Sequence, residues 1–539
     1  MVPGAFPTMG KVLIVGLDGA TWSLFEPWAR GGRMPGLAAL MARGTWGPLR
    51  STVPPLTLPA WSSMMTGRNP GGHGIFAFRR MVPGSYRTGG LATAADLRAP
   101  TMWDVAGRAG KHVGVVNVPP SYPIRPVNGF VVSCMLTPPG EPFTDPPELA
   151  DEIGDYQIDL PAPRGLRRAD PDFLARGLPY LEGLLRQTRL RTGATLTLMR
   201  RPWDLLCVVF YAPDRIQHYF WPELTGAGAG EPAVRAALEA VYAAVDEGLG
   251  HLVAAAGPDT TVILVSDHGF APKPERAFHL NRWLAGRGLL RERPLWRLRR
   301  RIVRRLVPAA ERARYDTVDR MVDMSRTRAW AQTLEPGTAG IWCNVQGRNP
   351  LGCVAEGSEY EALRADLVEG LHGMRDEQGR SLFTRVCRRE ELYHGPFVAE
   401  APDVLALCAS HVGVIYESVR RDLRARSLFG PFEELGFTGS HHATGLYLFA
   451  GPPIRALGTH GEYPIESIAP TALHLLGVPV PRRMEGPVCT SLLREDFLRD
   501  QPIRFADDEA DDSPATSGWK SAADEERIAE HLRALGYVE

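Results

Sequence analysis

Seven side chains with oxygen or nitrogen donors stand beside apolar runs of this sequence, where they could share metal ions. Asp214 and His218 are four residues apart, so on a helix both project from one face. Asp267 and His268 adjoin just before Gly269, a residue that permits a bend. The other donors are a carboxylate, a hydroxyl and an imidazole: Asp18, Thr57 and His441. A lone D-x-x-x-H pair is more often surface charge, but the full set offers enough nitrogen and oxygen ligands for two metal sites.

Thr57 stands where a helix is expected to begin. Pro55 keeps the approach extended, Pro59 suits a first helical turn, and residues 61–66 can continue the helix. We therefore predict that Thr57 is the N-cap of this helix. Free backbone N–H groups and the positive end of the helix dipole meet at such a position, which also favours a phosphate or sulfate. A threonine that only caps its helix is the simpler interpretation.

Three apolar, β-branched runs each lead to one of the carboxylates. They are residues 12–15 before Asp18, residues 205–210 before Asp214 and residues 261–265 before Asp267. Residues 233–256 between the last two runs are predicted to be helical, and the order strand, helix, strand favours a parallel sheet. Ligands bind such sheets outside the carboxyl ends of the strands. We therefore expect an α/β fold that brings the three carboxylates to one crevice.

Composition limits the function classes. The chain has 539 residues, 44% of them hydrophobic, so it can bury a large core. Its 61 basic and 61 acidic side chains balance, so net charge gives no reason to expect binding of nucleic acid. Its seven cysteines contain no CxxC pair and resemble reduced core residues of a cytosolic protein. The first residues lack the pattern of a secretory signal and no run approaches a membrane span, so we expect a cytoplasmic location.

The motifs fall in two parts of the chain that flank a stretch of different character. We assign residues 10–270 and 431–500 to a discontinuous catalytic domain and residues 271–430 to an inserted cap. Residues 501–539 are expected to form an acidic linker and a C-terminal helix.

The order of the motifs, Asp…Thr-x-Pro…D-x-x-x-H…S-D-H-G…G-x-H, resembles the alkaline phosphatase superfamily, and most of all its type I phosphodiesterase/nucleotide pyrophosphatase family. The resemblance covers residues 10–490 and implies a three-layer sandwich around a mostly parallel sheet, with an inserted cap. It also implies two divalent metal ions, usually zinc, although manganese or iron suit mixed ligands. One ion would be held by Asp18, Thr57, Asp267 and His268, and the other by Asp214, His218 and His441.

The same resemblance implies a phosphohydrolase that acts through a phosphothreonine intermediate on Thr57. The backbone N–H of Leu58 would hold a non-bridging oxygen, and Trp61 and Ser62 are the nearest candidates for contacts to the leaving group. The expected substrate is a phosphate-ester small molecule, either a nucleotide or a lipid head group. No specific binding of nucleic acid is expected, and the oligomeric state is not predicted.

Two positions depart from the family pattern. Many phosphodiesterases of this family have Asn three residues after the nucleophile, where this chain has Ala60. His442 follows the assigned ligand His441 and is a second candidate for that ligand. A phosphomonoesterase or phosphotransferase on the same site is therefore an alternative, and a non-catalytic, membrane-recruited binding protein is another. Sulfatases have Cys or Ser followed by x-Pro-x-Arg, whereas this chain has Thr57 and Trp61 in those places.

Residues 291–306 carry many arginines around a stripe of apolar side chains. A basic amphipathic helix of this kind can contact an anionic membrane at its surface. The alternative is a solvated lid helix whose stripe packs on the main domain.

Overall fold

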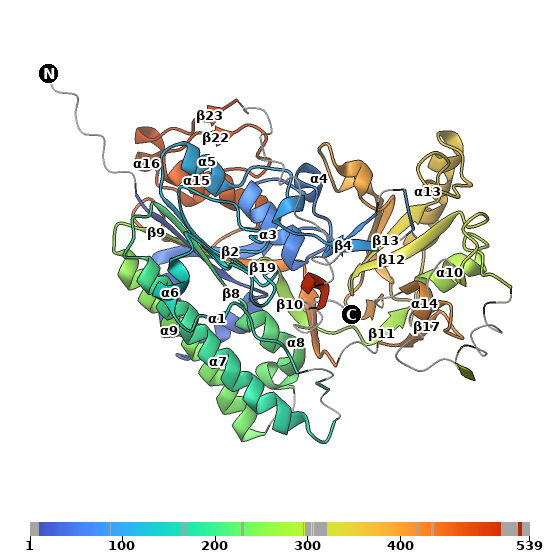
Figure 1. The fold of residues 1–539 in the computed structure, drawn as a ribbon, viewed down its shortest axis with the longest axis horizontal. Helices are drawn as coiled ribbons and strands as arrows, with labels where there is room; N and C mark the ends of the chain where they lie inside the picture. Colours follow the sequence, from blue (N-terminus) through green and yellow to red (C-terminus); the bar gives the residue numbers. More distant parts are fainter. Residues whose placement is uncertain are drawn as a thin grey trace. The chain divides into compact units, whose positions relative to one another are not determined.

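The computed structural model describes residues 10–82, 84–86, 88–163, 166–167, 170–227, 231–294, 296, 303, 305–306, 321–414, 418–432, 436–507 and 527–530. The chain divides into two compact units (Figure 1). The first unit comprises residues 1–78, 90–272 and 435–539, and the second comprises residues 79–89 and 273–434. Residues 79–89, which we assign to the catalytic domain from the sequence, thus belong to the second unit.

The first unit is built on a ten-stranded, mostly parallel sheet. From edge to edge the strands are β20 (Gly458–Thr459), β2 (Gly44–Arg50), β19 (Thr444–Ala450), β9 (Thr261–Val265), β1 (Val12–Leu17), β8 (Leu205–Phe210), β5 (Val113–Val116), β6 (Gly129–Val132) and β7 (Thr144–Asp145), and β21 (Tyr463–Pro464) pairs with β2. The central five, β9 to β6, are parallel. This confirms the predicted α/β fold.

Helices cover both faces of the sheet, because its central strands are apolar on both sides. Leu13, Val15 and Leu17 of β1 share one core with buried side chains of α1 (Trp22–Arg30), α2 (Pro35–Arg43), α7 (Phe173–Leu198) and α9 (Pro232–Ala256). The other layer contains α3 (Thr57–Thr66), α5 (Met102–Arg108) and α15 (Ile468–Leu475), which contact one another. Figure 1 shows α7 and α9 on one side of the sheet and α5 and α15 on the other.

Strand register places the segments that follow β1, β8 and β9 at the same end of the sheet, beyond the carboxyl ends of these strands. Leu17 of β1 pairs with Phe210 of β8, and Gly16 pairs with Val265 of β9, so all three parallel strands end together. Helix α8 (Ala212–Thr225) begins directly after β8. Beyond β9, β10 (Gly269–Pro272) pairs antiparallel with β18 (Gly439–His442), and Phe270 lies opposite His441. The Gly-Ser pair before His441 would suit a turn, but pairing with β10 keeps this segment extended.

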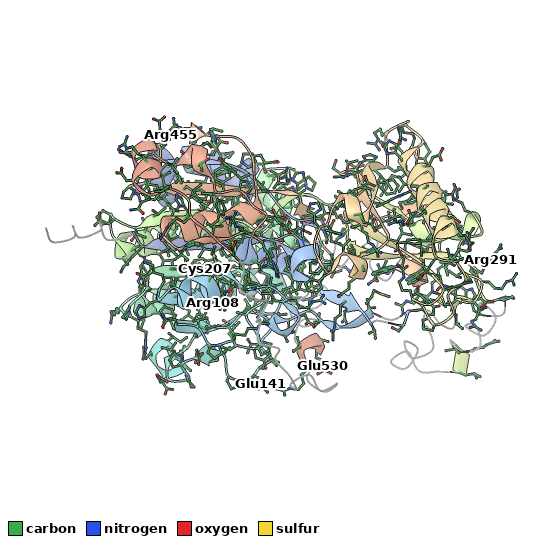
Figure 2. The ribbon with its side chains drawn as sticks, turned by 90° about the horizontal axis from the view of Figure 1, so that it is seen from above. Arg108, Glu141, Cys207, Arg291, Arg455 and Glu530 are labelled. Carbon is green, nitrogen blue, oxygen red and sulfur yellow. The ribbon has the colours of Figure 1, made fainter. Side chains whose placement is uncertain are left out.

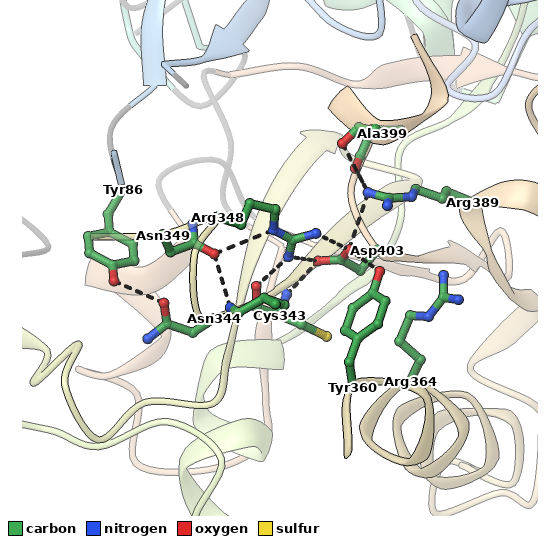
Figure 3. Close-up of polar contacts among 12 residues, drawn as sticks. Tyr86, Cys343, Asn344, Arg348, Asn349, Tyr360, Arg364, Arg389, Ala399 and Asp403 are labelled. Carbon is green, nitrogen blue, oxygen red and sulfur yellow. Dashed lines mark hydrogen bonds and ion pairs between the residues drawn. The ribbon is translucent and has the colours of Figure 1, made fainter. Parts of the chain in front are cut away.

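The second unit contains a four-stranded antiparallel sheet of β12 (Ala329–Glu335), β13 (Thr338–Cys343), β15 (Val404–Cys408) and β14 (Phe383–Arg388). Asp403, which is fully buried, precedes β15 and accepts hydrogen bonds from Arg348, Tyr360 and the backbone of Cys343 (Figure 3). Tyr86 donates to Asn344 Oδ1 at 2.9 Å (Figure 3), which explains why its segment belongs to this unit.

Two predicted segments lie largely outside the described residues, namely the basic helix at 291–306 and the linker and helix at 501–539. In the described part of the chain, no helix combines the length and the apolar character needed to cross a membrane. All seven cysteines are described and none forms a disulfide. Cys207 in β8 is fully buried in the first unit (Figure 2).

Candidate metal centre

Three carboxylates lie beyond the carboxyl ends of three adjacent parallel strands, at the same end of the sheet. Asp18 follows β1 directly, Asp214 lies in the first turn of α8 after β8, and Asp267 stands two residues beyond β9. Their exposed fractions are 0%, 1% and 1%. Burial of several like charges costs free energy unless cations or donors balance them. The three carboxylates at the strand ends therefore form one buried acidic site.

Asp214, His218 and His441 form the first of two clusters. His218 lies one helical turn after Asp214 on α8, and its Nε2 is 3.4 Å from Asp214 Oδ1. His441 Nε2 is also 3.4 Å from this oxygen and 3.1 Å from His218 Nε2. Three donor atoms on two elements thus converge on one point, as ligands of a cation do.

The second cluster gathers the side chains after β1 and β9. His268 Nε2 lies 3.3 Å from Asp267 Oδ2 and 3.8 Å from Asp18 Oδ1. Ligand atoms of Asp18, Asp214 and His268 all lie within 4.8 Å of one another, so Asp214 stands between the two clusters. The structure therefore brings together the six carboxylate and imidazole residues assigned as metal ligands from the sequence.

Several buried donor atoms of these clusters lack a hydrogen-bond partner. They are Asp18 Oδ1, Asp214 Oδ1, Asp267 Oδ2, His218 Nδ1 and His268 Nε2. Buried polar atoms are nearly always satisfied in proteins, so a group of unsatisfied atoms in one place requires an explanation. Divalent cations would satisfy the carboxylate oxygens and His268 Nε2 together, and mixed nitrogen and oxygen donors suit zinc, manganese or iron. The residues present fit a metal centre.

In several of these side chains, the second carboxylate oxygen or ring nitrogen already forms a hydrogen bond within the protein. Trp61 Nε1 donates to Asp18 Oδ2 at 3.2 Å, and the Gly19 N–H donates to Asp267 Oδ1 at 3.1 Å. His268 Nδ1 donates to the Gly269 carbonyl at 3.1 Å, and His441 Nδ1 donates to the carbonyl of residue 55 at 3.2 Å. Because a carbonyl can only accept, the Nε2 atom of each neutral imidazole offers its lone pair to the centre.

The pKa shifts of the acidic groups have the same origin. Burial, with Asp267 and Asp214 nearby, raises the pKa of Asp18 well above its usual value. Burial also raises the pKa of Asp267 to about 8, although the Gly19 N–H opposes this. Burial opposes ionisation of Asp214 as well, but His218 and His441 outweigh it and hold its pKa well below the usual value. Bound cations would favour ionisation of all three carboxylates.

Thr57 is the first residue of α3, and its hydroxyl is fully buried without a hydrogen-bond partner. The prediction that Thr57 is the N-cap was wrong. Leu56, with φ −134° and ψ 139°, occupies that position, and no side chain caps the helix. The Thr57 hydroxyl is therefore not engaged in capping. Residues on both sides of it reach the clusters, since Pro55 contacts His441 and Trp61 contacts Asp18.

The other predicted site residues lie on the same helix. Leu58, Ala60, Trp61 and Ser62 are all fully buried, and Ser62 Oγ has no hydrogen-bond partner. First-turn N–H groups such as that of Leu58 have no acceptor within their own helix. The contact of Trp61 with Asp18 was not predicted, because the two residues are 43 positions apart.

The structure distinguishes the two adjacent histidines at the end of β18. His441 points to Asp214 and His218, as given above. His442 is exposed, and its Nδ1 accepts a hydrogen bond from the Thr444 N–H at 3.1 Å. Neighbouring side chains on a strand point to opposite faces, so only one of the two can reach the centre.

Comparison with known proteins assigns the chain to a family. The sequence profile of the type I phosphodiesterase / nucleotide pyrophosphatase family matches residues 12–425. Murine ectonucleotide pyrophosphatase / phosphodiesterase 5 shares the fold, with a TM-score of 0.50 and 15% identity over 90% of this chain and 100% of its own. Phosphonoacetate hydrolase from Sinorhizobium meliloti aligns with a TM-score of 0.47 and 17% identity, over 84% of this chain and 92% of its own.

No curated protein matches the sequence. The family is nevertheless metal-dependent, and the residues that could bind metal stand together in the first unit. The chain belongs to the type I phosphodiesterase / nucleotide pyrophosphatase family of the alkaline phosphatase superfamily and is a phosphoester hydrolase.

Proposed function

We propose that the protein is a two-metal phosphodiesterase or nucleotide pyrophosphatase that forms a phosphothreonine intermediate on Thr57. The observation that carries this proposal is the Thr57 hydroxyl, which is buried at the start of α3 without a hydrogen-bond partner. Its helix is tied to Asp18 through Trp61, and the segment before it is tied to His441 through Pro55. A buried hydroxyl that neither caps a helix nor bonds to the protein is available as a nucleophile.

The seven donors divide between two ions. Asp18, Asp267 and His268 would hold one ion together with Thr57. Asp214, His218 and His441 would hold the other. When bound, such ions lower the pKa of a coordinated hydroxyl and neutralise charge on the phosphate. We propose zinc for both positions, and manganese or iron remain compatible with the donor set.

In the proposed reaction, Thr57 Oγ attacks phosphorus and the bond from phosphorus to the leaving-group oxygen breaks. The Thr57 proton is lost to solvent, and the departing alcohol or nucleotide takes up a proton. Water then attacks the phosphothreonine, the bond between phosphorus and Thr57 Oγ breaks, and the hydroxyl is restored. The free N–H of Leu58 at the start of α3 would donate to a non-bridging oxygen in both steps.

The proposed substrate is a phosphate-ester small molecule, namely a nucleotide or a lipid head group. The family name supports the diester assignment. Ala60 favours a second candidate, a phosphomonoesterase or phosphotransferase on the same site. Its methyl group, fully buried in α3, offers no donor where many relatives have Asn. Recognition of the esterified phosphate therefore has one side-chain donor fewer.

The experiment compares bis(p-nitrophenyl) phosphate with p-nitrophenyl phosphate, using protein reconstituted with zinc or manganese. We expect faster turnover of the diester, loss of turnover in Thr57→Ala, and an acid-stable adduct on the peptide that contains Thr57 after rapid quenching. Thr195→Ala is the matched control, because Thr195 is equally buried but lies on α7. Undiminished turnover by Thr57→Ala would exclude the threonine nucleophile, and turnover of the monoester alone would favour the second candidate.

A further inference from the structure

We infer that Trp61 is a positioning residue that orients the Asp18 carboxylate toward the metal centre and holds the nucleophile helix beside it. The inference rests on the proposed function, because it assumes that Asp18 binds a metal ion. It assigns Trp61 a part different from the leaving-group contact that the sequence predicts. No atom of Trp61 needs to touch substrate for this part.

The hydrogen bond of Trp61 selects one oxygen of Asp18. The indole Nε1 donates to Asp18 Oδ2 at 3.2 Å, and both side chains are fully buried. An indole N–H only donates, so it suits a carboxylate and cannot compete with it for a cation. Asp18 Oδ1 is left without a hydrogen bond and lies 3.8 Å from His268 Nε2. The bond thus leaves Oδ1 as the oxygen that faces the second cluster.

Packing against β1 also restricts the position of the indole. Gly16 lies in β1, two residues before Asp18, which follows the end of the strand. A Cβ atom built on Gly16 would lie 2.5 Å from Trp61 Cη2 and 2.8 Å from a methyl group of Val209. The ring therefore rests directly on the backbone of β1, which only a glycine at this position allows. Its outer edge touches Gly16 while its N–H reaches Asp18.

The same ring connects the metal centre with the nucleophile. Trp61 lies four residues after Thr57, which is about one turn of α3. The distance and rotation of α3 relative to β1 therefore depend on how the indole sits over Gly16. Asp267 is oriented in an analogous way, with one oxygen bound by the Gly19 N–H and the other without a partner. That donor belongs to the backbone, so the indole of Trp61 is the donor that a substitution can remove.

The first test compares metal binding by the wild type, Trp61→Phe and Trp203→Phe. Trp203 is the matched control, because its indole N–H also donates a hydrogen bond, to the Met199 carbonyl at 3.2 Å. It precedes β8, at the end of that strand away from the metal centre. We expect Trp61→Phe to bind zinc or cobalt about 10- to 100-fold more weakly by calorimetric titration. We also expect a changed visible spectrum of the cobalt-loaded protein. Trp203→Phe should match the wild type in both, and wild-type behaviour of Trp61→Phe would overturn the inference.

A double-mutant cycle separates orientation of Asp18 from general packing. In Asp18→Ala the acceptor of the indole bond is lost, so adding Trp61→Phe should weaken cobalt binding little further. Additive losses would show that Trp61 acts through packing alone and would overturn the inference. If Asp18→Ala by itself leaves metal affinity unchanged, the proposed metal assignment fails instead. Should Trp61→Phe not fold, β-(3-benzothienyl)alanine incorporated at position 61 removes only the N–H group, and the same affinities decide.

Discussion

Gln217 donates its side-chain amide to the carbonyl oxygen of Gly19 at 2.8 Å, across 198 positions of sequence. Gly19 has a φ of +67°, which glycine adopts without strain, and its N–H donates to Asp267. Gly19 is thus held through both its N–H and its carbonyl group. Gln217 lies between Asp214 and His218 in sequence, so it ties the helix of the first cluster to the loop of the second.

Replacing Gln217 by Met should lower the free energy of unfolding by about 1–3 kcal/mol, since the buried Gly19 carbonyl loses its side-chain donor. Methionine keeps the length and approximate volume of the side chain. Urea denaturation measures the effect. Gln378→Met serves as the control because Gln378 is exposed. Equal midpoints for the two variants would show that the bond contributes nothing.

Removal of metal should destabilise the protein, because the two clusters leave buried carboxylate oxygens unsatisfied. Binding that occurs only in the folded state stabilises by about 2.7 kcal/mol per site at 100 times Kd. We therefore expect EDTA to lower the melting temperature and abolish turnover, and added zinc or manganese to restore both. Asp214 belongs to both clusters, so the melting temperature of Asp214→Asn should respond much less to chelator and to added metal. A melting temperature insensitive to chelator and to added metal would contradict the centre.

Acid should destabilise the protein through His73, which follows α3 in the sequence. Burial, with Arg68 and Arg98 nearby, lowers the pKa of His73 to about 3. The Ile75 N–H donates to its Nδ1 at 3.2 Å, so Nε2 carries the proton and faces Ser63 Oγ at 3.0 Å. Below about pH 6.5, His73 binds a proton in the unfolded chain but not in the folded protein. Stability is therefore complete above pH 6.5 and falls toward pH 3.

This contribution has a slope of up to about 1.4 kcal/mol per pH unit, because one proton is involved. Stability measured by urea denaturation between pH 6.5 and 5 should fall less steeply in His73→Gln than in the wild type. Ser63→Ala removes the partner of Nε2 but keeps the imidazole, so it should lower stability at every pH and leave the slope as it is. Identical slopes for His73→Gln and the wild type would show that His73 does not contribute.

Asp403 should be essential to the sheet of the second unit. Its carboxylate is fully buried and accepts from Arg348 at 2.6 and 2.7 Å and from Tyr360 at 2.6 Å (Figure 3). Asp403→Asn leaves two guanidinium groups without their anion, that of the partly exposed Arg348 and that of the buried Arg389, which lies 3.2 Å from Asp403 Oδ1. Loss of one partner of a buried pair costs about 3–5 kcal/mol. We expect much faster hydrogen exchange in β12, β13 and β15.

The exposed pair of Asp366 and Arg287 provides the control for this change. Asp366→Asn should alter stability by no more than about 1 kcal/mol, as is usual for surface pairs. Exchange in β1 and β8 of the first unit is the internal reference. Equal exchange rates in the Asp403 and Asp366 variants would contradict a structural role for the buried carboxylate.

Much of the fold could be predicted because its signals are local. Residues 12–15, 205–210 and 261–265 are short apolar runs, and each lies in a strand of the central sheet. The spacing of Asp214 and His218 needs only a helix to bring them together, and α8 provides it. The prediction failed at Thr57 because residue preference points to a hydroxyl at the N-cap, whereas backbone angles decide where a helix begins.

The order and chemistry of the donors follow from local sequence patterns, because strand ends and helical spacing depend on neighbours along the chain. Tertiary structure decided which donors meet. His441 joins Asp214 only because β18 pairs with β10, and Asp18 is oriented only because Trp61 packs on Gly16. Such contacts depend on strand pairing and on close approach of backbones far apart in sequence. No local pattern of residue types encodes either one.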